Sequence, residues 1–228
     1  MKRISLFILV SAVCLSCQKK QETQNGTQLK PERPTIQNVE PEVLEPVFPE
    51  DLAEERTDWQ NPDIVLRSFS DLSSKIIADI GAGAGYFSFK LARVARKVIA
   101  LDIDPNALEY INEQKEIVGD WAERIETRLT PPDVPNLLQN ETQAVLVVNT
   151  FAFIPDQKAY FERLRESIQP DGELVIVDFK KGDIPVGPSD DRKLDATEVR
   201  SILRKAGYRK ITIDNESLEY QYIIKAVN

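Results

Sequence analysis

The residues with the clearest chemical potential form a glycine-rich turn with the pattern D-x-G-x-G-x-G. The pattern comprises Asp79, Gly81, Gly83 and Gly85, and it lies between the apolar segment Ile76–Ile80 and an amphipathic stretch. Glycine suits such a turn because the backbone must adopt unusual φ angles and pass close to a ligand, where a Cβ atom would collide. The turn therefore predicts close contact between the backbone and a bound ligand.

An acidic residue at the end of the next apolar segment strengthens this interpretation. Asp102 closes the segment 98–102 and lies 21 residues beyond Gly81. A carboxylate there can accept two hydrogen bonds from ribose hydroxyls, which is how adenosine cofactors are held at the carboxyl edge of a parallel sheet. The turn and the acid together predict a site for an adenosine-containing cofactor. A glycine-rich turn that binds no ligand is the alternative.

The elements that must position these residues alternate along the chain. Short β-branched segments alternate with amphipathic stretches, a pattern typical of βαβ units around a parallel sheet. The last two predicted strands have no helix between them, which indicates an antiparallel hairpin. The sequence therefore predicts an α/β fold: a doubly wound, mostly parallel, seven-stranded Rossmann-like sheet with a terminal antiparallel hairpin. The predicted strands are 76–80, 98–102, 125–129, 144–149, 173–178, 210–214 and 220–226, and the predicted helices are 85–95, 105–114, 158–167 and 196–206, with a short helix starting at Asn61 and Pro62.

The N-terminus has the features of an export signal. Lys2 and Arg3 precede an apolar run, and Ser16 and Cys17 follow it before the sequence becomes polar. This order is typical of a secretory signal, and the Ser-Cys pair resembles the bacterial lipobox, whose cysteine is lipidated. We therefore expect Cys17 to anchor the protein to a membrane of the bacterial cell envelope, on the periplasmic or surface side. A redox pair with Cys14 is the alternative, but it would need to begin a helix in a βαβ unit.

Composition divides the chain into three parts. Residues 1–17 are the predicted lipoprotein signal, and residues 18–50 carry many Pro, Gln, Glu and Lys residues but few apolar ones. Such a segment cannot bury enough surface to offset the entropy lost on ordering, so we expect a disordered tether. Residues 51–228 have the length of one ordinary domain.

Charge and residue counts exclude several functional classes. The chain has 29 Lys and Arg against 37 Asp and Glu, a net charge of −8, so general binding to nucleic-acid phosphates has no electrostatic support. It has no His, and its 2 Cys lie in the predicted signal, which removes Ser-His-Asp triads and His or Cys metal sites. We expect no nucleic-acid partner and no metal, and chemistry that depends on carboxylates, hydroxyls, Tyr, Lys or a cofactor.

Together these motifs resemble the class I S-adenosylmethionine-dependent methyltransferases. A nicotinamide-binding loop, G-x-G-x-x-G, would have its third glycine at the position of Tyr86. The G-x-G-x-G spacing, the two acids and the terminal hairpin are instead similar to the methyltransferases over about residues 55–228. A narrower likeness to the type 11 group includes the segments 149–151 and 220–222.

The resemblance implies a cofactor, a reaction and a set of binding residues. The cofactor would be S-adenosylmethionine, and the reaction would be methyl transfer to an unidentified small-molecule or protein acceptor. Asp79 and the glycine turn would wrap the methionine part of the cofactor. Asp102 would hold the ribose, and Ile103 would flank the adenine. The implied cofactor-binding residues are Asp79, Gly81, Ala82, Gly83, Gly85, Asp102, Ile103 and Asn149.

Asp133, Asp178 and Tyr86 are the candidate catalytic residues. Asn149 and Asp178 end predicted strands at the carboxyl edge, where substrates bind in open α/β sheets, although strand-end polar residues also cap loops. The type 11 pattern commonly carries histidines at the positions of Ala152, Phe153 and Arg192. In addition, an exported enzyme would need a source of S-adenosylmethionine outside the cytoplasm. The alternative function is therefore a methyltransferase-like lipoprotein that binds an adenosine-containing ligand without turnover.

Overall fold

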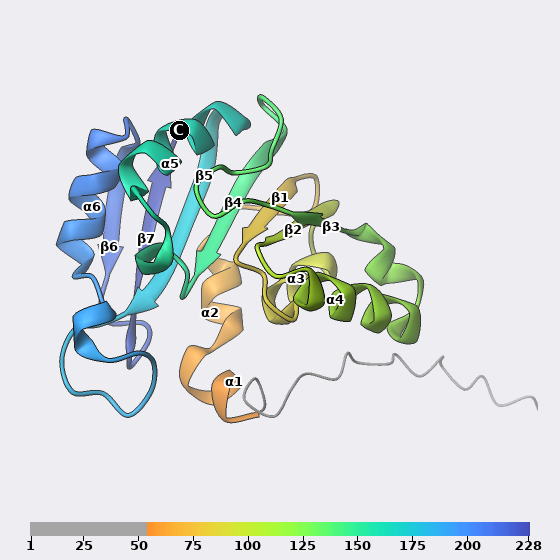
Figure 1. Cartoon of the computed structure of the whole chain (residues 1–228), viewed down its shortest axis with the longest axis horizontal. Helices are drawn as coiled ribbons and strands as arrows, with labels where there is room; N and C mark the ends of the chain where they lie inside the picture. The colour runs from red at the N-terminus through yellow and green to blue at the C-terminus, as the bar shows by residue number, and fades with distance from the viewer. Residues whose placement is uncertain (1–53) are drawn as a thin grey trace, which may run out of the picture. The chain divides into compact units, whose positions relative to one another are not determined.

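The computed structural model describes residues 54–228, so the predictions for the signal at 1–17, for lipidation at Cys17 and for the tether at 18–50 lie outside the described residues. The described helices and strands follow one another in a largely alternating order (Figure 1). In chain order they are α1 (Glu54–Gln60), α2 (Pro62–Arg67), β1 (Ile76–Ile80), α3 (Tyr86–Ala92), β2 (Lys97–Asp102), α4 (Pro105–Val118), the 3-10 helix η2 (Asp120–Arg124), β3 (Ile125–Leu129), β4 (Thr142–Val148), the 3-10 helix η3 (Phe151–Phe153), α5 (Gln157–Ser167), β5 (Ile168–Phe179), the 3-10 helix η4 (Asp190–Arg192), α6 (Ala196–Lys205), β6 (Arg209–Asp214) and β7 (Gln221–Val227).

The strands form one sheet of 7 strands in the order β3-β2-β1-β4-β5-β7-β6. Strands β1 to β5 pair in parallel, whereas β7 pairs antiparallel with both β5 and β6. The predicted fold class is confirmed, including the antiparallel hairpin at the β6 edge. The strand order reverses beside β1, since the chain moves outward through β2 and β3 and then returns to β4. Ligands bind outside the carboxyl ends of the strands at such a switch point.

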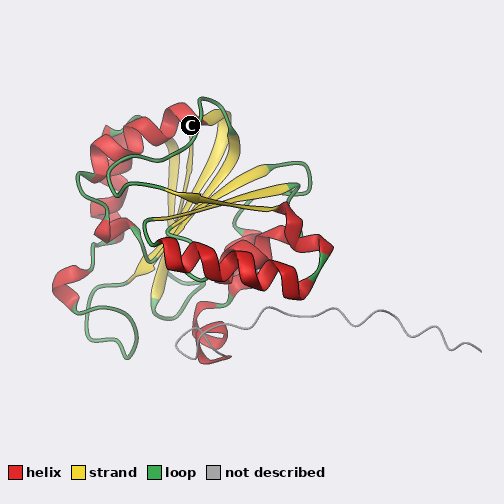
Figure 2. Cartoon of the chain, turned by 45° about the vertical axis from the view of Figure 1, so that its right-hand side comes forward, coloured by secondary structure: helices red, strands yellow, loops and turns green. Residues whose placement is uncertain are grey.

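Helices cover both faces of the sheet (Figure 2). Alternate side chains along a strand point to opposite faces, so Val98 and Ala100 join the cluster under α2, α3 and α4, while Ile99 and Leu101 join the cluster under α5 and α6. Burial on both faces explains why the central strands have continuously apolar sequences. Among residues 54–228, no helix combines the length and the apolar character needed to cross a bilayer.

Most predicted elements are present, with shifted ends. Helix α4 continues to Val118 because this residue extends the buried face, and the helix stops at Gly119, whose φ is 94°. Helix α2 begins as predicted, with the Asn61 side chain accepting a hydrogen bond from the Ile64 amide. Strand β5 begins at Ile168, earlier than predicted, because this residue pairs with the start of β4.

Helix α1 was not predicted, because its sequence has no apolar periodicity. Contacts with distant parts of the chain hold it in place. The Trp59 ring lies 5.7 Å from the Phe179 ring, and the Gln60 side chain donates a hydrogen bond of 2.9 Å to Gln221. The helix is therefore a product of tertiary packing.

Candidate functional site

The glycine turn joins β1 to α3 and lies against the end of β2. Gly81, Gly83 and Gly85 have φ angles of 74°, 54° and 88°, which L side chains rarely adopt. The amide groups of Gly81 and Ala82 both donate to the Leu101 carbonyl, over 2.8 and 3.0 Å. These bonds fix the turn beside Asp102, the predicted ribose acceptor.

Close packing also requires glycine at two of these positions. A Cβ atom on Gly81 would lie 2.1 Å from Thr150 Oγ1, and one on Gly85 would lie 2.9 Å from Ile111 Cγ1. A Cβ atom on Gly83 would meet nothing within 4 Å, so open space lies beside the middle of the turn. The turn therefore touches protein at both ends and leaves its centre accessible to a ligand.

Asp102 is held by backbone amides from both sides. Its Oδ2 accepts a hydrogen bond of 2.7 Å from the Gly83 amide, and its Oδ1 accepts one of 2.9 Å from the Asp104 amide. Each carboxylate oxygen can accept more than one hydrogen bond, so both remain able to accept from a ligand. The arrangement presents two fixed acceptors, which suits a pair of ribose hydroxyls.

Asp79 lies beneath the turn and is 2% exposed. Its Oδ2 accepts a hydrogen bond of 2.7 Å from Ser88 Oγ on α3. Burial raises the pKa of Asp79 to about 6; the Ser88 hydrogen bond acts in the opposite direction, and the nearby Asp102 charge raises it further. The side chain ties the turn to α3 and does not line the cavity described next.

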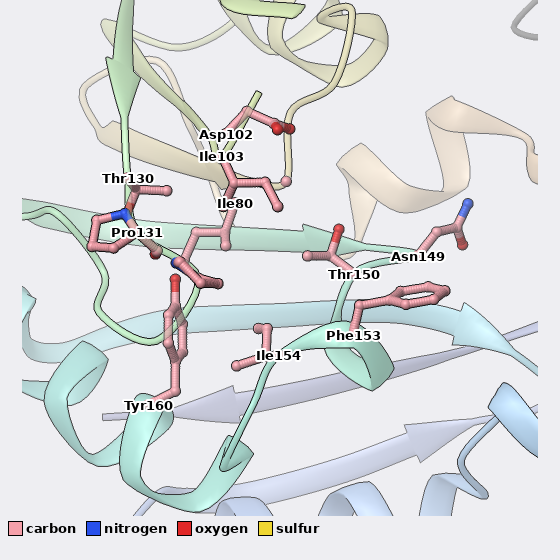
Figure 3. Close-up of a pocket in the computed structure, with 12 residues that line it drawn as sticks. Ile80, Asp102, Ile103, Thr130, Pro131, Asn149, Thr150, Phe153, Ile154 and Tyr160 are labelled. Atoms are coloured by element: carbon pink, nitrogen blue, oxygen red, sulfur yellow. The ribbon is translucent and has the colours of Figure 1, made fainter. Parts of the chain in front are cut away.

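A cavity of about 200 Å³ opens at the carboxyl edge of the sheet (Figure 3). Four predicted cofactor residues line it: Gly81, Asp102, Ile103 and Asn149. Ile103 is 61% exposed and Phe153 is 58% exposed, so apolar side chains reach the surface beside the cavity. The lining residues that were not predicted as site residues are Ile80, Thr130, Pro131, Pro132, Thr150, Phe153, Ile154 and Tyr160.

Most of these additional residues follow a strand and could have been found from that position. Thr130 comes directly after β3, and Thr150 comes two residues after β4. Tyr160 had no such signal, because it occupies the buried face of the amphipathic helix α5. Its place in the cavity depends on how that helix packs on the sheet.

Asn149, which is half-buried, belongs to a hydrogen-bonded chain of amide side chains. Its backbone is left-handed, with φ 55°, and its Oδ1 accepts a hydrogen bond from Gln221 Nε2. Gln221 Oε1 in turn accepts 2.9 Å from Gln60 Nε2, and Gln60 Oε1 accepts 2.6 Å from Arg56 Nε. Both glutamines are 0% exposed. These hydrogen bonds link the cavity wall to β7 and α1. Because the Asn149 oxygen accepts from Gln221, the amide N–H groups of Asn149 are left to donate to other partners.

Asp178 lies on the sheet face that packs on α5 and α6, because it stands opposite Tyr222 of β7 in that cluster. It is 5% exposed, and its Oδ1 accepts 2.8 Å from the Phe179 amide. Its Oδ2 has no hydrogen-bond partner within residues 54–228. Burial raises the pKa of Asp178 to about 6, against the opposing effect of the Phe179 amide.

The other two candidate catalytic residues also lie outside the cavity lining. Asp133 is exposed, and its backbone carbonyl accepts a hydrogen bond from the Arg163 side chain. Tyr86 is 3% exposed, and its hydroxyl lies 2.7 Å from Thr57 Oγ1. The Arg56 guanidinium stacks 4.6 Å from the centre of the Tyr86 ring. The structure therefore brings four of the predicted cofactor residues to the cavity, and it brings none of Asp133, Asp178 and Tyr86 there.

Among the described residues that line the cavity, Asp102 is the only one with an acidic side chain. Across residues 54–228, no group of three His, Cys, Asp or Glu side chains could hold a metal ion. The described site therefore consists of backbone amides, one carboxylate, hydroxyls and apolar walls. Such a set can bind and orient a nucleoside.

Comparison with known proteins gives a consistent result. Residues 78–176 match the family model described as a methyltransferase domain. The chain is 25% identical over 142 residues to a protein of Mycobacterium tuberculosis named as a probable S-adenosylmethionine-dependent methyltransferase. That alignment covers 60% of this chain and 49% of the relative, so the chain spans about half the length of this curated relative.

Solved structures share the fold. A crystal structure of a SAM-dependent methyltransferase from Aquifex aeolicus matches with a TM-score of 0.72 and 24% identity, over 77% of this chain and 93% of the other. Phosphoethanolamine N-methyltransferase 2 of Haemonchus contortus, solved in complex with S-adenosyl-L-methionine, matches with a TM-score of 0.64 and 15% identity, over 75% of this chain and 52% of the other. These likenesses confirm the Rossmann-like methyltransferase fold.

Proposed function

We propose that this protein binds S-adenosylmethionine and transfers its methyl group to an acceptor. The observation that carries the proposal is the Asp102 carboxylate, held by the Gly83 and Asp104 amides at the mouth of a cavity and beside the glycine turn. The match of residues 78–176 to the methyltransferase domain supports it. The expected cofactor agrees with the names of the curated relatives.

The residues present fit this cofactor. The turn from Gly81 to Gly85 is a cradle that Cβ atoms would strain or fill, and Asp102 has free acceptor capacity for a ribose. Ile103 would cover the base and Asn149 would contribute its amide donor. Bound there, S-adenosylmethionine supplies an electrophilic methyl group, and the protein supplies position and shelter from water.

The cavity offers few groups that could accept a proton from the methyl acceptor. In the proposed complex Asp102 holds the ribose, and the Asp178 side chain is buried and does not line the cavity. A methyl transfer that uses an acceptor already nucleophilic near neutral pH needs no protein base. We therefore infer an acceptor of that kind, such as a thiolate, an amine with a low pKa or an acidic hydroxyl.

Calorimetric titration of the purified protein with S-adenosylmethionine and S-adenosylhomocysteine tests the binding part of the proposal. We expect saturable binding of both compounds at one site per chain. Assay of cell-envelope acceptors with labelled S-adenosylmethionine then tests turnover. Absence of binding would reject the proposed function as a whole.

A non-catalytic binding role is the second candidate. The position of Asp133, Asp178 and Tyr86 favours it, because none of these candidate catalytic groups lines the cavity. Binding of S-adenosylmethionine with no S-adenosylhomocysteine formed from any acceptor fraction would support the binder. Stoichiometric formation of methylated product would support the enzyme.

We also propose a lipid anchor at Cys17, on the basis of the sequence pattern. In the producing cells, Cys17→Ser is expected to release the protein from the membrane fraction and to change the size of the mature chain. Cys14→Leu is the matched control, because it alters the neighbouring cysteine to the residue that lipoboxes usually carry there. Unchanged membrane partitioning of Cys17→Ser would contradict the anchor.

A further inference from the structure

The side chain of Tyr160 is buried, but its hydroxyl group is accessible from the cavity and has no hydrogen-bond partner among residues 54–228. Tyr160 is 2% exposed, and its ring packs edge-on against Phe161, with 5.6 Å between ring centres. Figure 3 shows the ring rising from α5 with its hydroxyl directed toward Pro131 and Ile80. Within residues 54–228 no hydrogen bond to this hydroxyl is found, and burial is the only influence that raises its pKa. A ligand that enters the cavity can therefore supply the hydrogen-bond partner of this hydroxyl.

The other polar side chains near this end of the cavity are already committed. Thr130 Oγ1 donates 2.7 Å to the Val134 carbonyl, and Thr150 Oγ1 donates 2.8 Å to the Val148 carbonyl. The two prolines that follow Thr130 have no backbone N–H to offer. Among the described residues that line the cavity, the Tyr160 hydroxyl and the Asn149 amide donor are therefore the neutral side-chain groups still free to pair with a ligand.

The size and the walls of the cavity indicate which part of a ligand it accepts. Its volume of about 200 Å³ is below the roughly 300 to 1,000 Å³ typical of a pocket for a whole drug-sized ligand. Ile80, Ile103 and Ile154 supply apolar walls, and Asp102 supplies the polar rim. A flat heteroaromatic ring attached to a ribose on Asp102 fits this combination of apolar sides and one polar end.

We propose that the Tyr160 hydroxyl hydrogen-bonds the adenine base of the bound nucleoside and is a specificity-determining residue of this site. A phenol hydroxyl can donate to a ring nitrogen and accept from the exocyclic amine, so it can read the edge of adenine that carries both. This inference rests on the proposed function, because Asp102 must hold the ribose for the base to reach Tyr160.

The test uses Tyr160→Phe, which removes one oxygen atom, in the full-length protein. Loss of one hydrogen bond predicts about 3- to 10-fold weaker binding of S-adenosylhomocysteine in calorimetry. Tyr208→Phe is the matched control, since Tyr208 is 3% exposed, belongs to the same buried cluster and has an unpaired hydroxyl outside the cavity. We expect the control to bind S-adenosylhomocysteine as the unaltered protein does.

A second pair of probes separates base recognition from packing. Ribosylbenzimidazole keeps the ribose and the bicyclic shape of adenosine but lacks the nitrogens of the six-membered ring and the amine. We expect Tyr160→Phe to bind adenosine more weakly, by the same factor as S-adenosylhomocysteine, and to bind ribosylbenzimidazole with unchanged affinity.

The results distinguish a failure of the Tyr160 role from a failure of the proposed function. Equal affinity of Tyr160→Phe and the unaltered protein for S-adenosylhomocysteine, or an equal loss for adenosine and ribosylbenzimidazole, overturns the role of Tyr160 and leaves the proposed function standing. Failure of the unaltered protein to bind S-adenosylhomocysteine overturns the proposed function, and this inference with it.

Discussion

Asp102→Ala removes the carboxylate at the rim of the cavity and is expected to weaken binding of S-adenosylmethionine about 100-fold or more. The reason is geometric. Each carboxylate oxygen accepts one backbone amide, at 2.7 and 2.9 Å, and can accept one ribose hydroxyl as well. The Gly83 and Asp104 amides are near the surface, so water can replace the carboxylate there and the fold itself loses little.

The magnitude follows from the two ligand hydrogen bonds. A hydrogen bond to a charged group contributes about 1.5 to 3 kcal/mol. Two bonds at the lower value amount to about 3 kcal/mol, and about 1.4 kcal/mol corresponds to a tenfold change in Kd. The expected loss is therefore on the order of 100-fold even at the weak end of the range.

The assay is isothermal titration of each purified variant with S-adenosylmethionine and S-adenosylhomocysteine. Asp104→Asn is the matched control: it removes the same charge two residues away, and asparagine can keep the N-cap that Asp104 provides to the Asn106 amide. We expect less than about a twofold change in Kd for this control. Equal affinity of Asp102→Ala and the unaltered protein would reject the ribose assignment. Equal losses in both variants would show that net charge, rather than direct hydrogen bonding, governs affinity.

Three further predictions concern the supports of the site, and urea unfolding measures each. Gly81→Ala should destabilise the fold by about 2 to 4 kcal/mol, because the new Cβ would lie 2.1 Å from Thr150 Oγ1 at a φ of 74°; unfolding at the unaltered midpoint would contradict this. The pKa of Asp79 is about 6 in the folded protein and 3.8 in the unfolded chain, so the contribution of this group to stability is full below pH 3.8 and is lost as the pH rises through 6. Asp79→Asn should therefore match the unaltered protein near pH 4 and exceed its stability at pH 7 by up to roughly 3 kcal/mol, and a difference that does not grow with pH would refute the argument. Gln221→Leu should lower stability by about 2 to 4 kcal/mol, because it leaves buried amide groups at Asn149 and in α1 without partners, whereas a loss below about 0.5 kcal/mol would show that the amide chain is dispensable.

The amide chain also gives α1 a role at the site. Gln60 and Gln221 are 161 residues apart in sequence, yet their side chains join α1 to the Asn149 amide at the cavity wall. The Thr57 hydroxyl contacts Tyr86 at the start of α3. Helix α1 is thus positioned to stabilise both the glycine turn and the end of β4 in one arrangement.

The amino-acid sequence by itself determined the fold class and the glycine turn and carboxylate for which we propose nucleoside binding. Gly81, Gly83 and Gly85 could be predicted because their backbone requirement is local. Asp102 could be placed beside them because a short crossover brings β2 next to β1 in parallel register, with Ile80 opposite Leu101. Both features depend on residues close in the chain.

Only the tertiary structure decided the rest. Asp178 ends a strand at the correct edge, but packing buries its side chain without bringing it to the cavity lining. Helix α1 and the Gln60 to Gln221 bond depend on partners far away in sequence, which no local pattern encodes. Tyr160 has the periodicity of a core residue, and its hydroxyl reaches the cavity because of where α5 rests on the sheet. Local backbone chemistry can be read from neighbouring residues, whereas the direction of a side chain depends on the packing of the whole domain.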